Sequence, residues 1–129
     1  LLGLVACMAP AIAMGNRVIL SASEPFPLAA TDFVQVLETS DVPAGVVNIL
    51  TGPQADLAEP MARHMDIDAV WCFGAAELSG VVEKGAASNI KRTWVNHGMA
   101  RDWFGTEGAG REFLQAATEV KNIWVPYGE

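Results

Sequence analysis

The feature that most constrains the fold is an alternation of short apolar runs with longer helical patterns over residues 1–84. Short runs rich in Val and Ile, bounded by Gly, Pro and Asn, are typical of buried strands, and they occur at 17–20, 46–50 and 67–73. Helices are predicted at 1–14, 28–39, 54–64 and from Gly74 onward. Such alternation predicts that the three strands lie parallel in one sheet with helices on both faces. The expected fold class is therefore α/β, with a partial doubly wound, Rossmann-like parallel sheet.

The character of the sequence changes at residues 85–89, a stretch of small residues that predicts a loop between two regions. Beyond this loop, residues 111–118 predict a short helix, and residues 120–127 predict a strand whose side chains alternate between two faces. Three of the four tryptophans also lie beyond the loop, and Trp and Tyr are favoured at interfaces. We therefore divide the chain into residues 1–86 and a C-terminal tail, 87–129, which we expect to pack as a strand or arm on another domain or subunit.

The charge balance excludes several kinds of partner. The net charge is −7 and the isoelectric point is near 4.7. Binding to nucleic acid or to an anionic membrane surface requires clustered Lys and Arg, so neither partner is expected. The apolar N-terminal run lacks a basic segment and is too short to span a bilayer. The absence of an initiator Met favours a chain that begins within a domain, so this run is expected to be a buried helix.

The titratable residues show no pattern typical of catalysis. Cys7 and Cys72 both lie in apolar runs outside any CxxC pair, which predicts buried free thiols in a reducing, cytoplasmic compartment. Neither cysteine has a neighbouring His that would lower its pKa, so neither is predicted to be a nucleophile. The other candidates show no metal-ligand or acid–base spacing and are predicted to be structural or solvated: His64, His97, Asp66 and Asp68. We therefore expect no catalytic residue and no metal site in this chain.

Three motifs resemble segments of the aldehyde dehydrogenase superfamily, in the same order and spacing. Residues 9–20, APAIAMGNRVIL, and the Ser-Glu pair that follows are similar to APALAAGNTVVLKPSE. Residues 42–52, VPAGVVNILTG, resemble GLPPGVVNVVTG, and residues 64–77 lie where the family reads HPDVDKVAFTGSTE. The resemblance implies that residues 1–86 are a partial NAD-binding-like domain. The parent family oxidises aldehydes to carboxylic acids with NAD or NADP.

The resemblance also identifies the positions that would contact the cofactor. These cofactor-binding positions are Ser21, Glu24, Gly52, Gly74 and Ala75. In the family a Lys and a Glu hydrogen-bond the adenosine ribose, whereas Ser21 replaces that Lys and is too short to reach a ribose hydroxyl. The family's Gly-Ser turn opens a helix whose N-terminus receives the pyrophosphate, and Ala75 replaces that serine while Phe73 replaces a threonine. Each lost polar contact costs about 1–3 kcal/mol, so NAD binding by this chain is expected to be weak or absent.

The catalytic half of the family, with its nucleophilic cysteine and general-base glutamate, is missing, so the chain alone is expected to be inactive. Residues 89–94 and 120–128 resemble the end of the family-sixteen branch. In that branch a complete dehydrogenase is followed by a second, truncated dehydrogenase-like domain. The resemblance therefore implies a C-terminal fragment that serves as a structural and assembly module. Its expected partners are the upstream dehydrogenase domain, a second subunit or both, in a full-length protein that is a homo-oligomer.

Two alternatives remain open at this point. The chain could be a residual module that still binds NAD or another nucleotide at Gly74, which a cofactor titration would detect. It could also be an excised segment of an ordinary active aldehyde dehydrogenase, which the upstream coding sequence would reveal.

Overall fold

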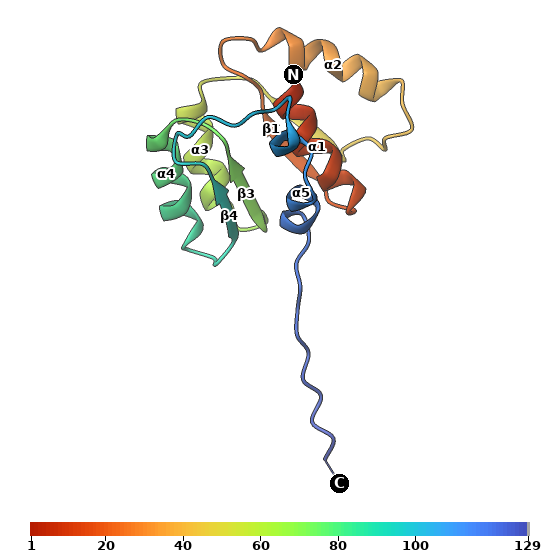
Figure 1. Ribbon diagram of the computed structural model, residues 1–129, viewed down its shortest axis with the longest axis vertical. Coiled ribbons are helices and arrows are strands. Elements are labelled where there is room, and N and C mark those ends of the chain that lie inside the picture. Colours follow the sequence, from red (N-terminus) through yellow and green to blue (C-terminus); the bar gives the residue numbers. More distant parts are fainter. Residues whose placement is uncertain (129) are drawn as a thin grey trace.

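The computed structural model describes residues 1–128, which form helices alternating with short strands. The elements are α1 (Leu2–Ala13), β1 (Val18–Ser21), α2 (Leu28–Glu38), β2 (Val47–Leu50), α3 (Gln54–Arg63), β3 (Ala69–Cys72), α4 (Ala76–Ala86), β4 (Arg92–Val95), a 3-10 helix η1 (Thr106–Gly108) and α5 (Arg111–Ala116). Figure 1 shows α3 and α4 beside β3 and β4, with α1, β1 and α5 on the other side of the molecule. The predicted α/β class is confirmed.

Within residues 1–128 the strands form two separate parallel pairs rather than one sheet. In the first pair Val18 of β1 is in register with Val47 of β2. In the second pair Ala69 of β3 is in register with Arg92 of β4. The parallel direction was predicted correctly, but the prediction that 46–50 and 69–73 share one sheet with 17–20 is wrong. Apolar periodicity indicates that a segment is a buried strand, but it does not specify which strand lies beside it.

Glycine and proline set the ends of several elements. Pro27 and Pro53 stand directly before α2 and α3, where the missing N–H of proline is not needed by the helix. Gly15 follows α1 with φ +84°, and Gly45 precedes β2 with φ +79°, a left-handed backbone that favours glycine. The helix predicted at the N-terminus is not interrupted at Pro10, because α1 continues through this residue to Ala13.

A small apolar core lies between α3, α4 and β3. Ala62 and Val82 are almost fully buried, and Val70 of β3 packs against them. The two helices approach closely because Gly85 has no side chain: an added Cβ would lie 2.7 Å from the Cβ of Ala62. A larger residue at Gly85 would therefore force α3 and α4 apart.

Strand β4 was not predicted from the sequence. Of the loop expected at 85–89, residues 85 and 86 still belong to α4, whereas residues 87–89 form a turn. The turn continues to Ile90, which has φ +57°. The strand that follows begins with Arg92 beside the buried Lys91, whose Nζ donates to the backbone oxygen of His64 at 2.5 Å. Two adjacent cations obscure the apolar pattern by which buried strands are recognised.

The region after β4 folds back on the start of the chain as far as Thr118. The side-chain amide of Asn16 donates to the backbone oxygen of Ala117 at 2.8 Å, and the guanidinium of Arg92 donates to that of Thr118 at 2.6 Å. The first bond connects the end of α5 to the residues after α1, and the second connects it to β4. Helix α5 packs against α1, as Figure 1 also shows. The division of the chain at residue 86 stays a prediction.

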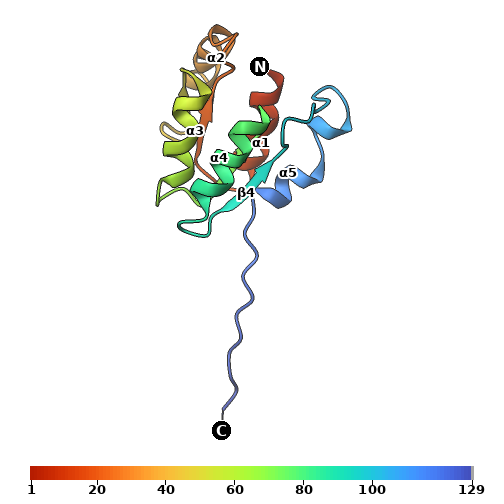
Figure 2. The same ribbon diagram turned by 90° about the vertical axis from the view of Figure 1, so that its left-hand side faces the viewer.

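The last described residues form an extended arm that leaves the folded body. None of residues 119–128 belongs to a helix or strand, and Figures 1 and 2 both show this segment running away from the helices. The strand predicted over 120–127 is therefore absent from the single chain, because this segment has no neighbouring strand with which to pair. Its apolar side chains are exposed, including 92% of Trp124 and 84% of Ile123. Among the described helices, none has the length and apolar character needed to cross a membrane.

Candidate nucleotide-binding site

The five predicted cofactor positions all lie at the carboxyl ends of parallel strands. Ser21 ends β1 and Glu24 follows it, Gly52 follows β2, and Gly74 and Ala75 follow β3. Open α/β sheets bind ligands at this edge, so the topology agrees with the sequence prediction of where a nucleotide would lie. Whether the local contacts suit a nucleotide is a separate question.

A cleft of about 1030 Å³ separates the two strand pairs and contains two of these positions. All residues of β1 and β3 line it, and Ser21, Gln54 and Gly74 lie where the two strands end. Among the described residues, β1 is paired with β2 alone and β3 with β4 alone. The structure therefore brings Ser21 and Gly74 to one cleft, but that cleft lies between two strands that are each paired on one side.

The hydroxyl of Ser21 is buried and has no hydrogen-bond partner among residues 1–128. A buried hydroxyl without a partner costs about 1–3 kcal/mol, so this position is a polar atom that the fold leaves unsatisfied. Its oxygen lies close to the backbone and lacks the reach of a lysine ammonium.

Glu24 is already used within the fold. Its Oε2 accepts a hydrogen bond from the backbone N–H of Gln54 at 3.1 Å. Gln54 is the first residue of α3, whose preceding residue, Pro53, has no side chain that could cap the helix. The carboxylate therefore acts as the N-terminal cap of α3, where both the free N–H groups and the helix dipole favour a negative charge.

The N-terminus of α4, predicted to receive a pyrophosphate, is covered by a turn from the region after β4. Ala75 precedes the helix and offers no hydroxyl. The backbone N–H of His97 donates to Ser79 Oγ at 3.2 Å, which places the next residue, Gly98, against the first turn of α4. A Cβ added to Gly98 would lie 3.1 Å from the backbone nitrogen of Ala76. The backbone of Gly98 therefore lies close to this amide and narrows the space in which an anion would bind.

Glycine at position 74 is explained by packing within the fold. A side chain there would come within 3.3 Å of Leu78 Cδ1 and 3.6 Å of Gln54 Oε1. Gly52 adopts φ +152°, a conformation that side chains disfavour. Gly52 therefore allows the turn after β2, and Gly74 allows Leu78 to pack closely after β3, whether or not a ligand is present.

Both thiols are held in the neutral form. Burial raises the pKa of Cys7 from its ordinary 9.0 to about 12, and the nearby Arg101 offsets only part of this effect. Burial also raises the pKa of Cys72, against a smaller lowering by a hydrogen bond from the backbone of Gly74. A cysteine nucleophile reacts as the thiolate, so neither residue is prepared for covalent catalysis near neutral pH.

The two histidines have partners nearby in the fold. The Nδ1 of His64 accepts from the backbone N–H of Asp66 at 3.2 Å, and the Nε2 of His97 lies 3.6 Å from Glu83. Over residues 1–128 no group of three His, Cys, Asp or Glu residues is arranged to hold a metal ion. The site also fits a dinucleotide poorly. Ser21 lacks the reach of a lysine, Glu24 already caps α3, and a turn lies over the N-terminus of α4.

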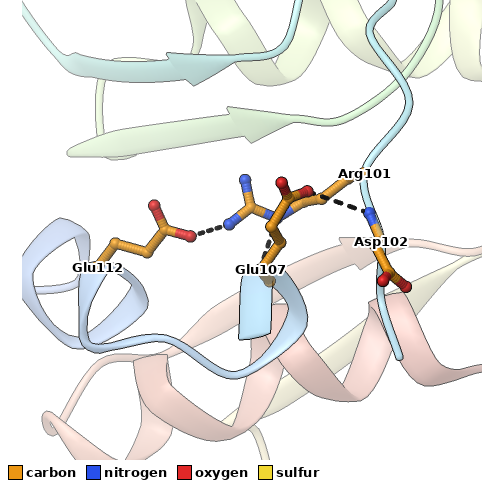
Figure 3. A network of polar contacts seen from close by, with 4 residues as sticks. All are labelled: Arg101, Asp102, Glu107 and Glu112. Atoms are coloured by element: carbon orange, nitrogen blue, oxygen red, sulfur yellow. Dashed lines mark hydrogen bonds and ion pairs between the residues drawn. The ribbon is translucent and has the colours of Figure 1, made fainter. Parts of the chain in front are cut away.

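Sequence reasoning missed a cluster around Arg101. Figure 3 shows Arg101 between Glu112, with which it forms an ion pair, and Glu107, whose backbone oxygen accepts from Arg101 Nε at 2.9 Å. The Glu107 carboxylate in turn accepts from the backbone N–H of Asp102 at 3.2 Å. The sequence predicts an interface role for the tryptophans beyond residue 89, and its local pattern does not indicate that Trp94 and Trp103 lie beside Arg101.

Comparison with known proteins places this geometry in a family context. The chain matches the aldehyde dehydrogenase family over residues 1–122. It is 37% identical over 92 residues to the NADP/NAD-dependent aldehyde dehydrogenase PuuC of Escherichia coli, a match that covers 70% of this chain and 19% of the relative. An aldehyde dehydrogenase-like protein of Schizosaccharomyces pombe is 30% identical over 122 residues, 94% of this chain and 23% of that protein.

Solved structures show the same relationship. Aldehyde dehydrogenase C from Pseudomonas syringae, a variant complexed with NAD+ and octanal, matches with a TM-score of 0.67 and 37% identity over 70% of this chain. Indole-3-acetaldehyde dehydrogenase without ligand matches with a TM-score of 0.68 and 33% identity over 74% of this chain. The chain spans 19% and 23% of these two structures, so it corresponds to a small part of such an enzyme.

Proposed function

This chain belongs to the aldehyde dehydrogenase family, and we propose that within the family it is a structural and assembly module, without catalytic activity of its own. The observation that carries this proposal is the cleft between β1 and β3, where the parallel sheet is interrupted. The oxidation of an aldehyde with NAD or NADP would belong to the larger protein of which this segment forms a part.

Backbone geometry supports the view that the cleft is a place for another strand. The N–H groups of Val18 and Ala22 donate to the backbone oxygens of Val46 and Leu50 at 2.8 Å and 2.9 Å. The backbone groups of alternate residues of a strand point to opposite sides. The N–H groups of Ile19 and Ser21 are therefore directed away from β2, toward the cleft. Unpaired strand edges of this kind are sites at which a further strand adds.

The opposite wall of the cleft is complementary. The backbone oxygens of Asp68 and Cys72 accept from the N–H groups of Arg92 and Asn96, at the start of β4 and directly after it. The alternating backbone groups of Ala69 and Trp71 are therefore directed toward the cleft. A strand supplied by another segment of the dehydrogenase, parallel to β1 and β3, would pair with both walls and join the four strands into one sheet. Parallel sheets are stable when they are continuous and covered by helices on both faces.

The proposed partners are therefore an upstream dehydrogenase domain, which would supply the strand, and a second subunit in a homo-oligomer. The exposed arm supports the second partner, because apolar residues such as Ile123 and Trp124 are left uncovered in the single chain. Residual nucleotide binding is the less favoured function, since Ser21 and Ala75 cannot replace the contacts of the family's lysine and serine.

A pair of proline substitutions tests the proposal. Ile19→Pro removes an N–H directed into the cleft, whereas Ile49→Pro removes one on the outer edge of β2, away from β1. In the full-length dehydrogenase, Ile19→Pro should weaken the docking of this segment by about ten- to a hundredfold and lower the melting temperature. Ile49→Pro should have a much smaller effect. Equal effects of the two substitutions would contradict strand insertion between β1 and β3.

A further inference from the structure

Four aromatic rings surround the guanidinium group of Arg101. The distances from Arg101 Cζ to the ring centroids are 5.1 Å for Phe73, 5.0 Å for Trp94, 5.7 Å for Trp103 and 4.9 Å for Phe113. Each distance lies within the range of about 6 Å over which a cation is attracted to a ring face. We call these four residues the aromatic box. The Arg101 side chain is only 14% exposed, so the cation is largely removed from water.

The polar surroundings of the aromatic box also favour a cation. Glu112 forms an ion pair with Arg101, and the backbone oxygen of Glu107 accepts from Arg101 Nε at 2.9 Å (Figure 3). A guanidinium group is planar, so its faces can stack on rings while its edges donate hydrogen bonds. The aromatic box supplies the stacking contacts, and Glu107 and Glu112 beside it supply the hydrogen-bond acceptors.

The rings support one another independently of Arg101. Phe73 makes edge-to-face contacts with Trp94 at 4.9 Å and with Trp103 at 5.4 Å between centroids. Phe113, which is 1% exposed, packs on Trp94 at 5.0 Å. Aromatic pairs in such geometry are stabilising in their own right. Trp103 is held against α1, where a Cβ added to Gly3 would lie 3.1 Å from its ring. We therefore expect the box to keep its shape when Arg101 is shortened.

The aromatic box also joins distant parts of the chain. Phe73 follows β3, Trp94 lies in β4, Trp103 lies in the loop before η1, and Phe113 lies in α5. Arg101 stands in the same loop as Trp103 and contacts both sheet and helix. We propose that the aromatic box is a binding site for a guanidinium cation, and that the chain's own Arg101 fills it as an internal ligand. In this role Arg101 holds residues 96–118 against β3 and β4. This inference does not depend on the proposed assembly function.

Chemical rescue tests the proposal. Arg101→Ala should lower the melting temperature by roughly 5–10 °C, because the cation, its ring contacts and its ion pair are lost together. Methylguanidinium at low millimolar concentration should bind the emptied box, quench or shift the tryptophan fluorescence and recover most of the lost melting temperature. Methylammonium and sodium chloride at equal ionic strength should recover much less, since neither presents a planar face with several donors.

Arg111→Ala is the matched control, because Arg111 is exposed and its loss changes the net charge by the same amount. It should show little destabilisation and no response to methylguanidinium. Absence of rescue in folded Arg101→Ala, or equal rescue by methylammonium or in the control, would overturn the proposal.

Nuclear magnetic resonance of the wild-type chain provides a test that does not rely on the variant folding. The ring currents of the box should shift the protons of the Arg101 side chain strongly upfield. The side-chain protons of Arg111 should show no such shift. Glu112→Gln should reduce the upfield shift of Arg101 while the ring–ring contacts persist. Arg101 signals at the positions typical of a solvated arginine would show that the box does not hold it.

Discussion

The carboxylate of Glu24 accepts a hydrogen bond from the backbone N–H of Gln54 at 3.1 Å, and so connects the end of β1 to the start of α3. The family resemblance identified Glu24 as a ribose ligand, but in this chain its side chain caps a helix. A helix cap and a ribose ligand would use the same carboxylate oxygens, so the presence of glutamate at this position is not by itself a sign of nucleotide binding.

Substitution of Glu24 is therefore expected to affect stability. Glu24→Ala should lower the free energy of unfolding by about 0.5–1 kcal/mol, since an exposed cap contributes toward the lower end of its range. Chemical denaturation of the isolated chain measures this change. Glu38→Gln, at an exposed position near the end of α2, serves as the control and should cause no such loss. Equal stability of Glu24→Ala and wild type would show that the cap contributes nothing.

NAD binding should be weak or undetectable by titration calorimetry. The replacement of two polar contacts, at Ser21 and Ala75, weakens affinity by roughly one to four orders of magnitude if the losses add. The turn at Gly98 occupies space beside Ala76 and opposes binding further. Micromolar affinity for NAD in the wild-type chain would contradict this prediction.

Restoring the family residues separates the two causes of weak binding. Ser21→Lys combined with Ala75→Ser should recover affinity if the missing side chains are the main defect. Failure of the double variant to bind would instead implicate Phe73 or the turn at Gly98, which the substitutions leave in place.

The buried thiol of Cys7 predicts a loss of stability in alkali. Its pKa is raised from 9.0 to about 12 in the folded chain, so the folded state holds this proton more tightly than the unfolded state. The contribution of the protonated thiol to the free energy of unfolding is complete below about pH 9. It is lost as the pH rises toward 12, by at most about 1.4 kcal/mol per pH unit. Cys7→Ala should therefore flatten the dependence of the unfolding free energy on pH between these limits. Parallel curves for the variant and the wild type would contradict the raised pKa.

Trp124 tests the role of the arm. In the isolated chain this side chain is 92% exposed, so Trp124→Ala should change the free energy of unfolding by less than about 0.5 kcal/mol. In the full-length protein the same substitution should weaken oligomer formation, because large aromatic side chains contribute strongly to interfaces. Light scattering gives the oligomer mass and calorimetry the melting temperature. An unchanged mass together with a large loss of stability in both contexts would instead indicate that the arm folds onto its own chain.

Local sequence was sufficient to predict the α-helices and three of the four strands that residues 1–128 form. Apolar periodicity, and glycine or proline at positions such as Gly15 and Pro53, act within a few residues and therefore appear in the sequence itself. The motifs around 9–20, 42–52 and 64–77 were also sufficient for the family, which the match over residues 1–122 confirms.

Tertiary structure decided the remaining features of the fold and the site, because these features depend on which distant segments meet. Strand β4 is specified by its pairing with β3, and its polar start hides it from pattern reading. The interruption between β1 and β3 follows from the order of the strands, and apolar periodicity carries no information about that order. Glu24 and Gln54 lie 30 residues apart, and the rings around Arg101 come from four separate elements or loops. Local patterns determine most of the helices and strands, whereas β4 and the contacts over such separations depend on how the segments pack.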